Sequence, residues 1–225
     1  MGWLDRLRGK PPQADVVGAK IPGAIGHALP LGFRINGRVA LDTLVCRAHP
    51  GALTAQLPEG HQGIPCYGHI DLGSGYALHR FYLDDDAFVQ VSTCGELVEG
   101  IKAFVFVETV NPANQAEFQR YITEHEHLGA ATIDYAGRSW QREFGDDDGA
   151  AARVPAVVYD EVLYRHDPPR KDDDLTHYAM LYRRAVPELD RDEFLLVTGE
   201  DYGPSEFCIT YAIGLALTTA DLDIT

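Results

Sequence analysis

Residues 64–93 read IPCYGHIDLGSGYALHRFYLDDDAFVQVST, and this stretch decides the fold class. Three runs rich in branched and aromatic residues are separated by a Gly-Ser-Gly segment at 73–75 and by three aspartates at 84–86. Glycine, serine and aspartate favour turns, whereas runs of this composition favour strands. The stretch therefore predicts three consecutive antiparallel strands joined by tight turns.

Further strands are predicted on the C-terminal side of this stretch. Residues 101–110 are apolar on both faces, which indicates a buried central strand. Residues 176–184 and 192–200 flank Pro187 as a paired hairpin, and residues 207–217 alternate large and small side chains with a period of two. Shorter strands are expected at 131–135, 139–144 and 154–165, with a break at the aspartates 172–174.

One helix is predicted, over residues 113–129, which read ANQAEFQRYITEHEHLG. Phe118, Tyr121 and Ile122 share one face at helical spacing, and Gly129 favours a stop at the C-terminal end. An apolar stripe of this kind packs against other apolar surface. The expected fold class is therefore α+β and strand-rich, with antiparallel meander sheets and one main helix packed on the sheet.

The chain of 225 residues is long enough for one large strand-rich domain. Residues 1–30 combine a short amphipathic turn with an arm rich in proline and glycine, so we expect the folded body at residues 31–225. A single domain is expected there, with two halves at 31–130 and 131–225 as the alternative.

Composition limits the classes of partner. The formal net charge is −15, which opposes binding to nucleic acid. No secretory signal is visible and the longest apolar tract is too short to span a bilayer, so we expect a cytoplasmic protein. The cysteines form no Cys-x-x-Cys pair and are expected as free thiols. They are Cys46, Cys66, Cys94 and Cys208.

The first ten residues form a candidate contact with a protein partner or with the inner membrane. Apolar side chains lie at helical spacing while the basic ones project elsewhere, which is typical of a short basic amphipathic turn. The residues concerned are Trp3, Leu4, Arg6, Leu7, Arg8 and Lys10. A frayed terminal helix without a binding role is the alternative.

The sequence contains no recognisable catalytic, cofactor-binding or metal-binding motif. The aspartate triplets at 84–86, 146–148 and 172–174 lack the spacing of an EF-hand and lie between strand runs, so we interpret them as turns. Glu124 and His127 have the spacing of a metal-binding pair, but a solvated helix end is the simpler interpretation because only one good helix is available. We therefore predict no catalytic set, no cofactor and no metal site.

The hairpin at 69–82 carries the polar residues of a candidate ligand or partner surface. These residues are His69, Asp71, His79, Arg80 and Tyr82. Arg80 and Tyr82 share one face of their strand and His79 lies on the other, so one face either buries polar groups or lines a groove. The simpler expectation is that Arg80 pairs with a nearby carboxylate such as Asp71.

The order of these segments resembles a known family. The segments are LPLGFRINGRVALD at 29–42, the hairpins at 68–91, VYDEVLYR at 158–165 and LYRRAVPELDRDEFLLVTGE at 181–200, and they are similar to the YjfK-like family of bacterial proteins. That family is described only as a domain of unknown function, so the resemblance implies no activity and assigns no functional residue. It implies a context, since members are often encoded beside a membrane-stress protein, a small membrane protein and an ATP-grasp ligase.

Two functions follow as hypotheses. The first is a non-enzymatic accessory protein that binds a protein partner near the inner face of the cytoplasmic membrane and is linked to membrane stress. The second is a small enzyme or ligand-binding domain whose site is assembled around the hairpin at 69–82.

Overall fold

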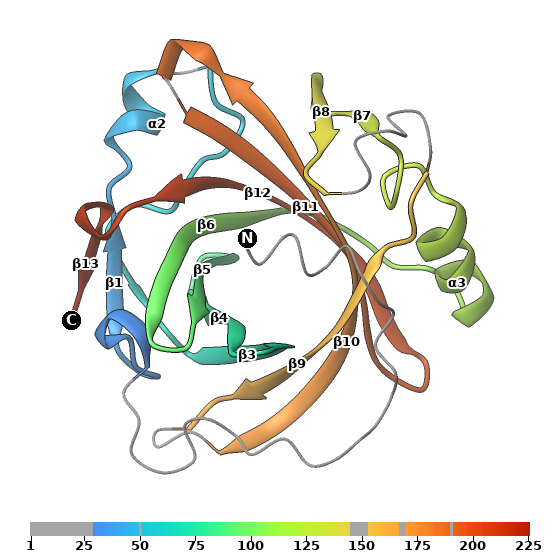
Figure 1. Cartoon of the computed structure of the whole chain (residues 1–225), viewed down its shortest axis with the longest axis horizontal. Helices are drawn as coiled ribbons and strands as arrows, with labels where there is room; N and C mark the ends of the chain where they lie inside the picture. The colour runs from blue at the N-terminus through green and yellow to red at the C-terminus, as the bar shows by residue number, and fades with distance from the viewer. Residues whose placement is uncertain (1–28, 50, 145–152, 167–169, 190) are drawn as a thin grey trace.

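The computed structural model describes residues 29–49, 51–144, 153–166, 170–189 and 191–225 (Figure 1). The predicted amphipathic turn, with Trp3, Leu4, Arg6, Leu7, Arg8 and Lys10, lies outside the described residues, and so does the aspartate triplet at 146–148.

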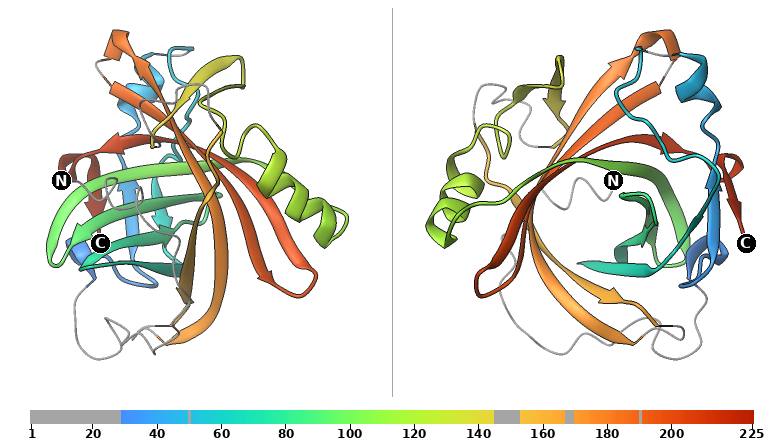
Figure 2. Two further views of the ribbon diagram at one scale, coloured as in Figure 1. Left: turned by 45° about the vertical axis from the view of Figure 1, so that its right-hand side comes forward. Right: turned by 180° about the vertical axis from the view of Figure 1, so that it is seen from behind.

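A closed antiparallel barrel of eight strands forms the centre of the molecule (Figures 1 and 2). In barrel order the strands are β3 (Cys66–Gly73), β4 (Tyr76–Tyr82), β5 (Ala87–Cys94), β6 (Leu97–Val110), β12 (Glu206–Leu217), β11 (Arg191–Gly203), β10 (Lys171–Val186) and β9 (Val157–Tyr164). β9 then pairs with β3 and closes the circle. The strand-rich antiparallel class is thus confirmed, but the sheet is a closed barrel rather than the predicted simple meander sheets, and closure leaves these strands without a free edge.

Several local predictions are confirmed by the strand boundaries. The turns at 73–75 and 84–86 join β3 to β4 and β4 to β5, and β10 and β11 form the hairpin around Pro187. The predicted break at 172–174 is wrong, because these aspartates lie inside β10. Asp173 and Asp174 pair with Leu163 and Val162 of β9, and their side chains stay exposed, so three adjacent carboxylates do not end the strand.

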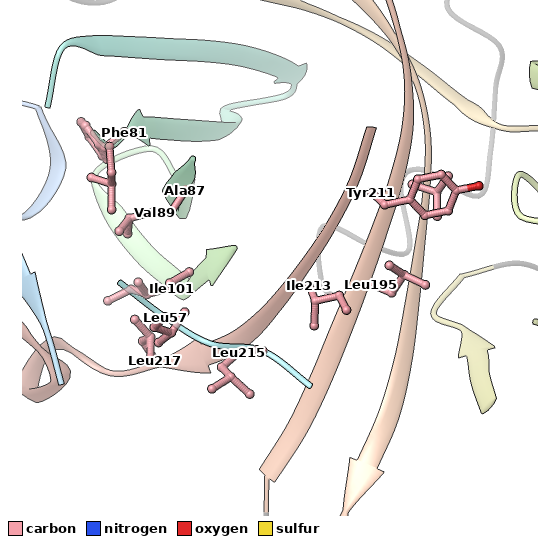
Figure 3. Packing of buried hydrophobic residues seen from close by; sticks show 14 of the residues in the cluster. Leu57, Phe81, Ala87, Val89, Ile101, Leu195, Tyr211, Ile213, Leu215 and Leu217 are labelled. Atoms are coloured by element: carbon pink, nitrogen blue, oxygen red, sulfur yellow. The ribbon is translucent and has the colours of Figure 1, made fainter. Parts of the chain in front are cut away.

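The two faces of the barrel wall carry different side chains, as β12 shows. Its large residues, such as Ile213 and Leu215, belong to the main hydrophobic core outside the wall, whereas Ala212 packs in a second cluster inside the barrel. Figure 3 shows Ile213 and Leu215 in the outer core together with Leu57, which belongs to residues 29–63, a segment that covers one side of the barrel. The large and small alternation predicted for 207–217 therefore separates the outside of the barrel from its interior.

One side of the barrel is covered by the N-terminal segment and a small sheet (Figure 2). Phe33 stacks on Phe81 of β4 with ring centroids 4.0 Å apart. The covering elements are η1 (Pro30–Gly32), β1 (Arg38–Leu41), α2 (Leu44–Ala48), β2 (His61–Gly63), η4 (Thr219–Asp221) and β13 (Leu222–Ile224). They bury the outward-facing residues of the wall.

The main helix, α3 (Gln115–Glu124), packs on another part of the wall, next to the hairpin of β7 (Thr132–Tyr135) and β8 (Arg138–Arg142) (Figure 1). Asn114 caps α3 by accepting a hydrogen bond from the backbone N–H of Glu117 at 3.0 Å. Phe118 and Ile122 are buried against Gly199 of β11, where an added Cβ would lie 2.6 Å from Ile122. The helix is confirmed, but it ends before the predicted Gly129 because His125 adopts an extended conformation.

A buried carboxylate on β11 attaches residues 52–55, which lie between α2 and β2, to the barrel. Glu193, which is 0% exposed, accepts hydrogen bonds from the backbone N–H of Thr54 at 2.6 Å and of Ala55 at 2.5 Å. Arg184 donates its Nε–H to Glu193 at 2.7 Å and an Nη2–H to the carbonyl of Ala52 at 2.6 Å. The η3 turn (Pro187–Leu189) lies between these two strands.

Replacing Glu193 with alanine tests this attachment. The variant leaves Arg184 and two backbone N–H groups without their acceptor, so we expect the free energy of unfolding to fall by about 3–5 kcal/mol in urea titrations. Glu59→Ala is the control, since the Arg47–Glu59 pair is 62% and 66% exposed and its loss should cost less than about 1 kcal/mol. Equal stability of the two variants would contradict the assigned role.

Candidate functional site

A cluster of buried polar side chains occupies the barrel interior. Arg80 from β4 is 3% exposed, Glu161 from β9 is 0% exposed and His177 from β10 is 1% exposed. All three lie on strand faces that point into the barrel, together with Gln90 of β5 and Tyr159 of β9. Charged groups this deeply buried occur in proteins only when they are paired.

Arg80 is the centre of the cluster. Its Nη1–H donates to Glu161 Oε2 at 2.9 Å, its Nε–H donates to Gln90 Oε1 at 3.1 Å, and its Nη2–H donates to the hydroxyl of Tyr159 at 2.9 Å. The guanidinium carbon lies 5.2 Å from the ring centroid of Phe88. The planar guanidinium is thereby held in one orientation, with three of its five N–H donors engaged.

Glu161 accepts hydrogen bonds from three neighbours. Besides Arg80, the hydroxyl of Tyr82 donates to Oε1 at 2.9 Å and Nε2 of His177 lies 2.6 Å from Oε2. Burial alone would raise the pKa of Glu161, but the Arg80 charge and the hydrogen bonds from His177 and Tyr82 lower it to about 2. Glu161 is therefore ionised at neutral pH, whereas burial raises the pKa of Tyr82 and keeps its hydroxyl protonated.

A glycine makes room for this carboxylate. An added Cβ at Gly68 of β3 would lie 1.7 Å from Glu161 Oε1. Gly68 lies between Arg80 and Glu161. It pairs with Arg80 of β4 on one side and with Leu163 of β9, two residues from Glu161, on the other. The ion pair can cross β3 only because this position has no side chain.

His177 offers one ring nitrogen that is not used by the cluster. Because Glu161 is ionised, Nε2 of His177 carries the proton of their hydrogen bond. Nδ1 is buried and has no hydrogen-bond partner among the described residues. The ring of Tyr159 packs against the imidazole with centroids 5.1 Å apart. A buried nitrogen of this kind requires a partner that the described side chains do not supply.

A small cavity of about 40 Å³ adjoins the cluster. Its lining is mainly apolar and comes from strands on all sides of the barrel and from the segment after β8. The apolar residues are Leu72, Leu78, Phe104, Phe144, Val157, Ala179, Leu181 and Leu196. Three polar residues of the cluster, Arg80, Gln90 and Tyr159, also line it. A mainly apolar lining with a few polar groups is typical of small-molecule sites, and a cavity of this size limits the occupant to a very small molecule.

The hairpin residues named from the sequence are divided between two environments. Arg80 and Tyr82 point into the barrel, whereas His69 and His79 lie on the outer face, with ring centroids 5.4 Å apart. Asp71 is exposed and accepts a hydrogen bond from the N–H of Gly73 at 2.8 Å, so it is not the partner of Arg80.

Sequence reasoning missed four residues of the cluster: Gln90, Tyr159, Glu161 and His177. Each lies on a strand that was predicted, and the only available signal was a charged or polar residue inside an otherwise apolar run. Their partners are far apart in the sequence, since Arg80 and Glu161 are separated by 81 positions. Periodicity within one strand carries no information on such a contact.

The remaining sequence candidates have structural partners. His125 stacks on Tyr121 with ring centroids 4.1 Å apart, and His127 Nδ1 lies 2.9 Å from the hydroxyl of Tyr211. Within the described ranges, no three His, Cys, Asp or Glu side chains are placed to hold a metal ion, and no helix is long and apolar enough to cross a bilayer. All four cysteines are free thiols.

The buried ion pair can be tested by substitution. Glu161→Gln leaves the charge of Arg80 buried without its counter-ion, so the free energy of unfolding should fall by about 3–5 kcal/mol. Adding Arg80→Met removes the uncompensated charge, and the double variant should lose less than the sum of the single variants by at least about 1 kcal/mol. Strict additivity in urea unfolding would contradict a direct pair.

The outer histidines predict acid sensitivity. Burial, and secondarily the neighbouring His69, lower the pKa of His79 from 6.5 to about 4. The unfolded chain therefore binds a proton at higher pH than the folded chain, and stability that is complete above pH 6.5 is lost as the pH falls toward 4, by at most about 3 kcal/mol. His79→Gln should flatten the pH dependence of the unfolding free energy in this window. The exposed His61 provides the control His61→Gln, which should leave the slope unchanged.

Comparisons with known proteins relate the chain to one family. A family model described as "Protein of unknown function (DUF2491)" matches residues 3–223. The uncharacterized protein YjfK of Escherichia coli (strain K12) is 29% identical over 203 residues, which cover 87% of this chain and 90% of that protein. No solved structure matches the chain. The resemblance inferred from the sequence is confirmed, and the chain belongs to the family of proteins of unknown function to which this model corresponds.

Proposed function

We propose that this protein binds a small molecule inside its barrel, and that the ligand has an apolar body and at least one polar group. The observation that carries the proposal is the cavity of about 40 Å³ in the barrel interior, lined by apolar side chains with Arg80, Gln90 and Tyr159 among them. Barrels of about eight strands are just wide enough either to be filled by side chains or to hold one small ligand.

The polar groups at the cavity are rigidly held before any ligand enters. Gln90 and Tyr159 both bind the guanidinium of Arg80, whose charge is compensated by Glu161. Two of the five N–H donors of Arg80 remain outside these hydrogen bonds, so a ligand oxygen could accept from them. Groups held in advance in this way reduce the entropy lost on binding.

This proposal takes up the second hypothesis drawn from the sequence, with the site moved from the surface of the hairpin at 69–82 to the barrel interior. Arg80 and Tyr82 are common to both versions of the site. The first hypothesis, an accessory protein at the membrane, concerns residues 3–10, which lie outside the described residues. We therefore put forward ligand binding as the function that the described barrel favours.

Binding can be measured by isothermal titration calorimetry with phenol, a single ring that carries one polar group. The full chain should show saturable binding, and Ala179→Phe should weaken binding at least tenfold because the added ring fills the cavity. Val158→Phe is the control, since Val158 is 37% exposed and the same kind of bulk is added outside the barrel.

Two outcomes would contradict the proposal. One is the absence of saturable binding to the unmodified chain. The other is unchanged binding by a folded Ala179→Phe protein, since the probe would then occupy a different place. Leu181→Phe provides a second cavity-filling variant if Ala179→Phe does not fold.

A further inference from the structure

The hydrogen bonds of the polar cluster determine which kind of polar group the cavity presents to a ligand. Three polar residues line the cavity, Arg80, Gln90 and Tyr159. A hydrogen bond has a direction, because an N–H or O–H group donates and a lone pair accepts. The direction of each bond inside the cluster therefore fixes what each of these residues has left for a bound molecule.

Arg80 has only hydrogen atoms to offer. A guanidinium carries five N–H donors and no acceptor. Its Nε–H, one Nη1–H and one Nη2–H are used by Gln90, Glu161 and Tyr159. The other Nη1–H and Nη2–H have no acceptor among the described residues, since the His177 nitrogen that lies 3.5 Å from Nη1 carries a proton itself. Arg80 can therefore only donate to a ligand.

Gln90 is restricted in the same way. Because Arg80 cannot accept, the Gln90 atom that lies 3.1 Å from its Nε must be the amide oxygen. The NH2 group on the other side of the amide has no hydrogen-bond partner in the part of the chain that the structure describes. The part of Gln90 that is left for a ligand is therefore also a donor.

The hydroxyl of Tyr159 keeps its hydrogen atom as well. Its oxygen accepts from Nη2 of Arg80 at 2.9 Å. Burial raises the pKa of Tyr159, so the phenol stays protonated at neutral pH. No acceptor among the described side chains takes this hydrogen atom. A buried hydroxyl group that accepts without donating favours an acceptor on the ligand.

The acceptors of the cluster are used inside it. Glu161 Oε1 accepts from the hydroxyl of Tyr82, and Oε2 accepts from Arg80 and His177. Nδ1 of His177 has no partner among the described residues, but His177 does not line the cavity. The other lining residues have hydrocarbon side chains. The cavity thus combines a group of donors with apolar surface.

The charge of the cluster favours a neutral acceptor. Arg80 and Glu161 form an ion pair at 2.9 Å with side chains that are 4% and 0% exposed, so the charge of the guanidinium is already compensated. A second anion at this depth would lack a counter-ion of its own, and burying such a charge costs far more than burying a neutral polar group. A carbonyl oxygen is neutral, accepts hydrogen bonds and carries no proton that needs an acceptor.

On the basis of the proposed ligand-binding function, we propose that the ligand is a small neutral ketone or aldehyde whose carbonyl oxygen accepts hydrogen bonds from Arg80, Gln90 and Tyr159. The cavity of about 40 Å³ excludes a long chain, so the carbonyl group carries only small apolar substituents. An alcohol of the same size fits the same space, but its O–H hydrogen meets a lining of donors.

The test compares acetone with propan-2-ol, which share one framework of non-hydrogen atoms and differ in the proton on the oxygen. Both are smaller than phenol, so size excludes neither of them. In titrations of the full chain followed by proton–nitrogen NMR correlation spectra, we expect acetone to bind about tenfold more tightly, because a buried donor without a partner is penalised. The side-chain NH2 signals of Gln90 should shift as acetone binds.

Gln90→Glu changes a donor of the lining into an acceptor with almost no change of shape. The variant keeps an oxygen next to Arg80 and replaces the NH2 group with a second oxygen. The preference for acetone should therefore disappear, because the new oxygen accepts from the alcohol. The matched control is Gln119→Glu, since Gln119 is exposed on α3 outside the barrel and should affect the binding of neither compound.

The outcomes separate this inference from the proposed function. Equal affinity of the unmodified chain for acetone and propan-2-ol would overturn the carbonyl proposal and leave cavity binding intact. So would tighter binding of sodium acetate than of acetone, an acetone preference that survives in folded Gln90→Glu, or Gln90 NH2 signals that stay unchanged at saturation. If phenol binds and acetone does not, the carbonyl proposal alone is wrong. If none of these compounds binds, the proposed function fails together with it.

Discussion

The ion pair between Arg80 and Glu161 crosses the seam at which the barrel closes. At this seam β3 pairs with β9 through only three residue pairs, whereas β10 and β11 pair along most of their length. The ion pair spans the seam from β4 to β9 and passes over Gly68, where no side chain blocks it. Burying two charges costs free energy, which the hydrogen bonds that Glu161 accepts from Tyr82 and His177, and those that Arg80 donates to Tyr159 and Gln90, help to offset. A polar interior is therefore a requirement of this closure as well as a feature of the candidate site.

The location of the hydrophobic core explains how the protein can keep a cavity at its centre. The larger of the two apolar clusters lies outside the barrel wall, between the wall and the segments that cover it. Phe33 on Phe81 and Phe118 on Gly199 are examples from two sides of the molecule. Because burial on the outer face provides much of the apolar stabilisation, the inner face does not have to be completely filled. The inner face is then available for polar residues and for a bound molecule.

Local patterns predicted the elements well and their assembly poorly. The strands and turns of residues 64–93, the hairpin around Pro187 and the helix that contains Phe118 and Ile122 were all found. A break was predicted at the aspartates 172–174, but they lie in β10. The long pairing of β10 with β9 and β11 outweighs the weak strand preference of aspartate. Of the site, the sequence singled out Arg80 and Tyr82, but it assigned Arg80 to Asp71, which lies on the opposite face of the hairpin.

The sequence by itself determined that the chain builds antiparallel strands and that residues 207–217 form a strand with one large face and one small face, since a period of two is a property of a single strand. It could not determine which face would enclose a space. In residues 207–217 the large side chains point outward and the small ones inward, and only the closing contact between β3 and β9 makes the small face an interior. The same closure brings Glu161 and His177 to Arg80 from positions 81 and 97 residues away. Contacts at such separations depend on strand order and register, which are properties of the whole sheet and leave no periodic trace in any one segment.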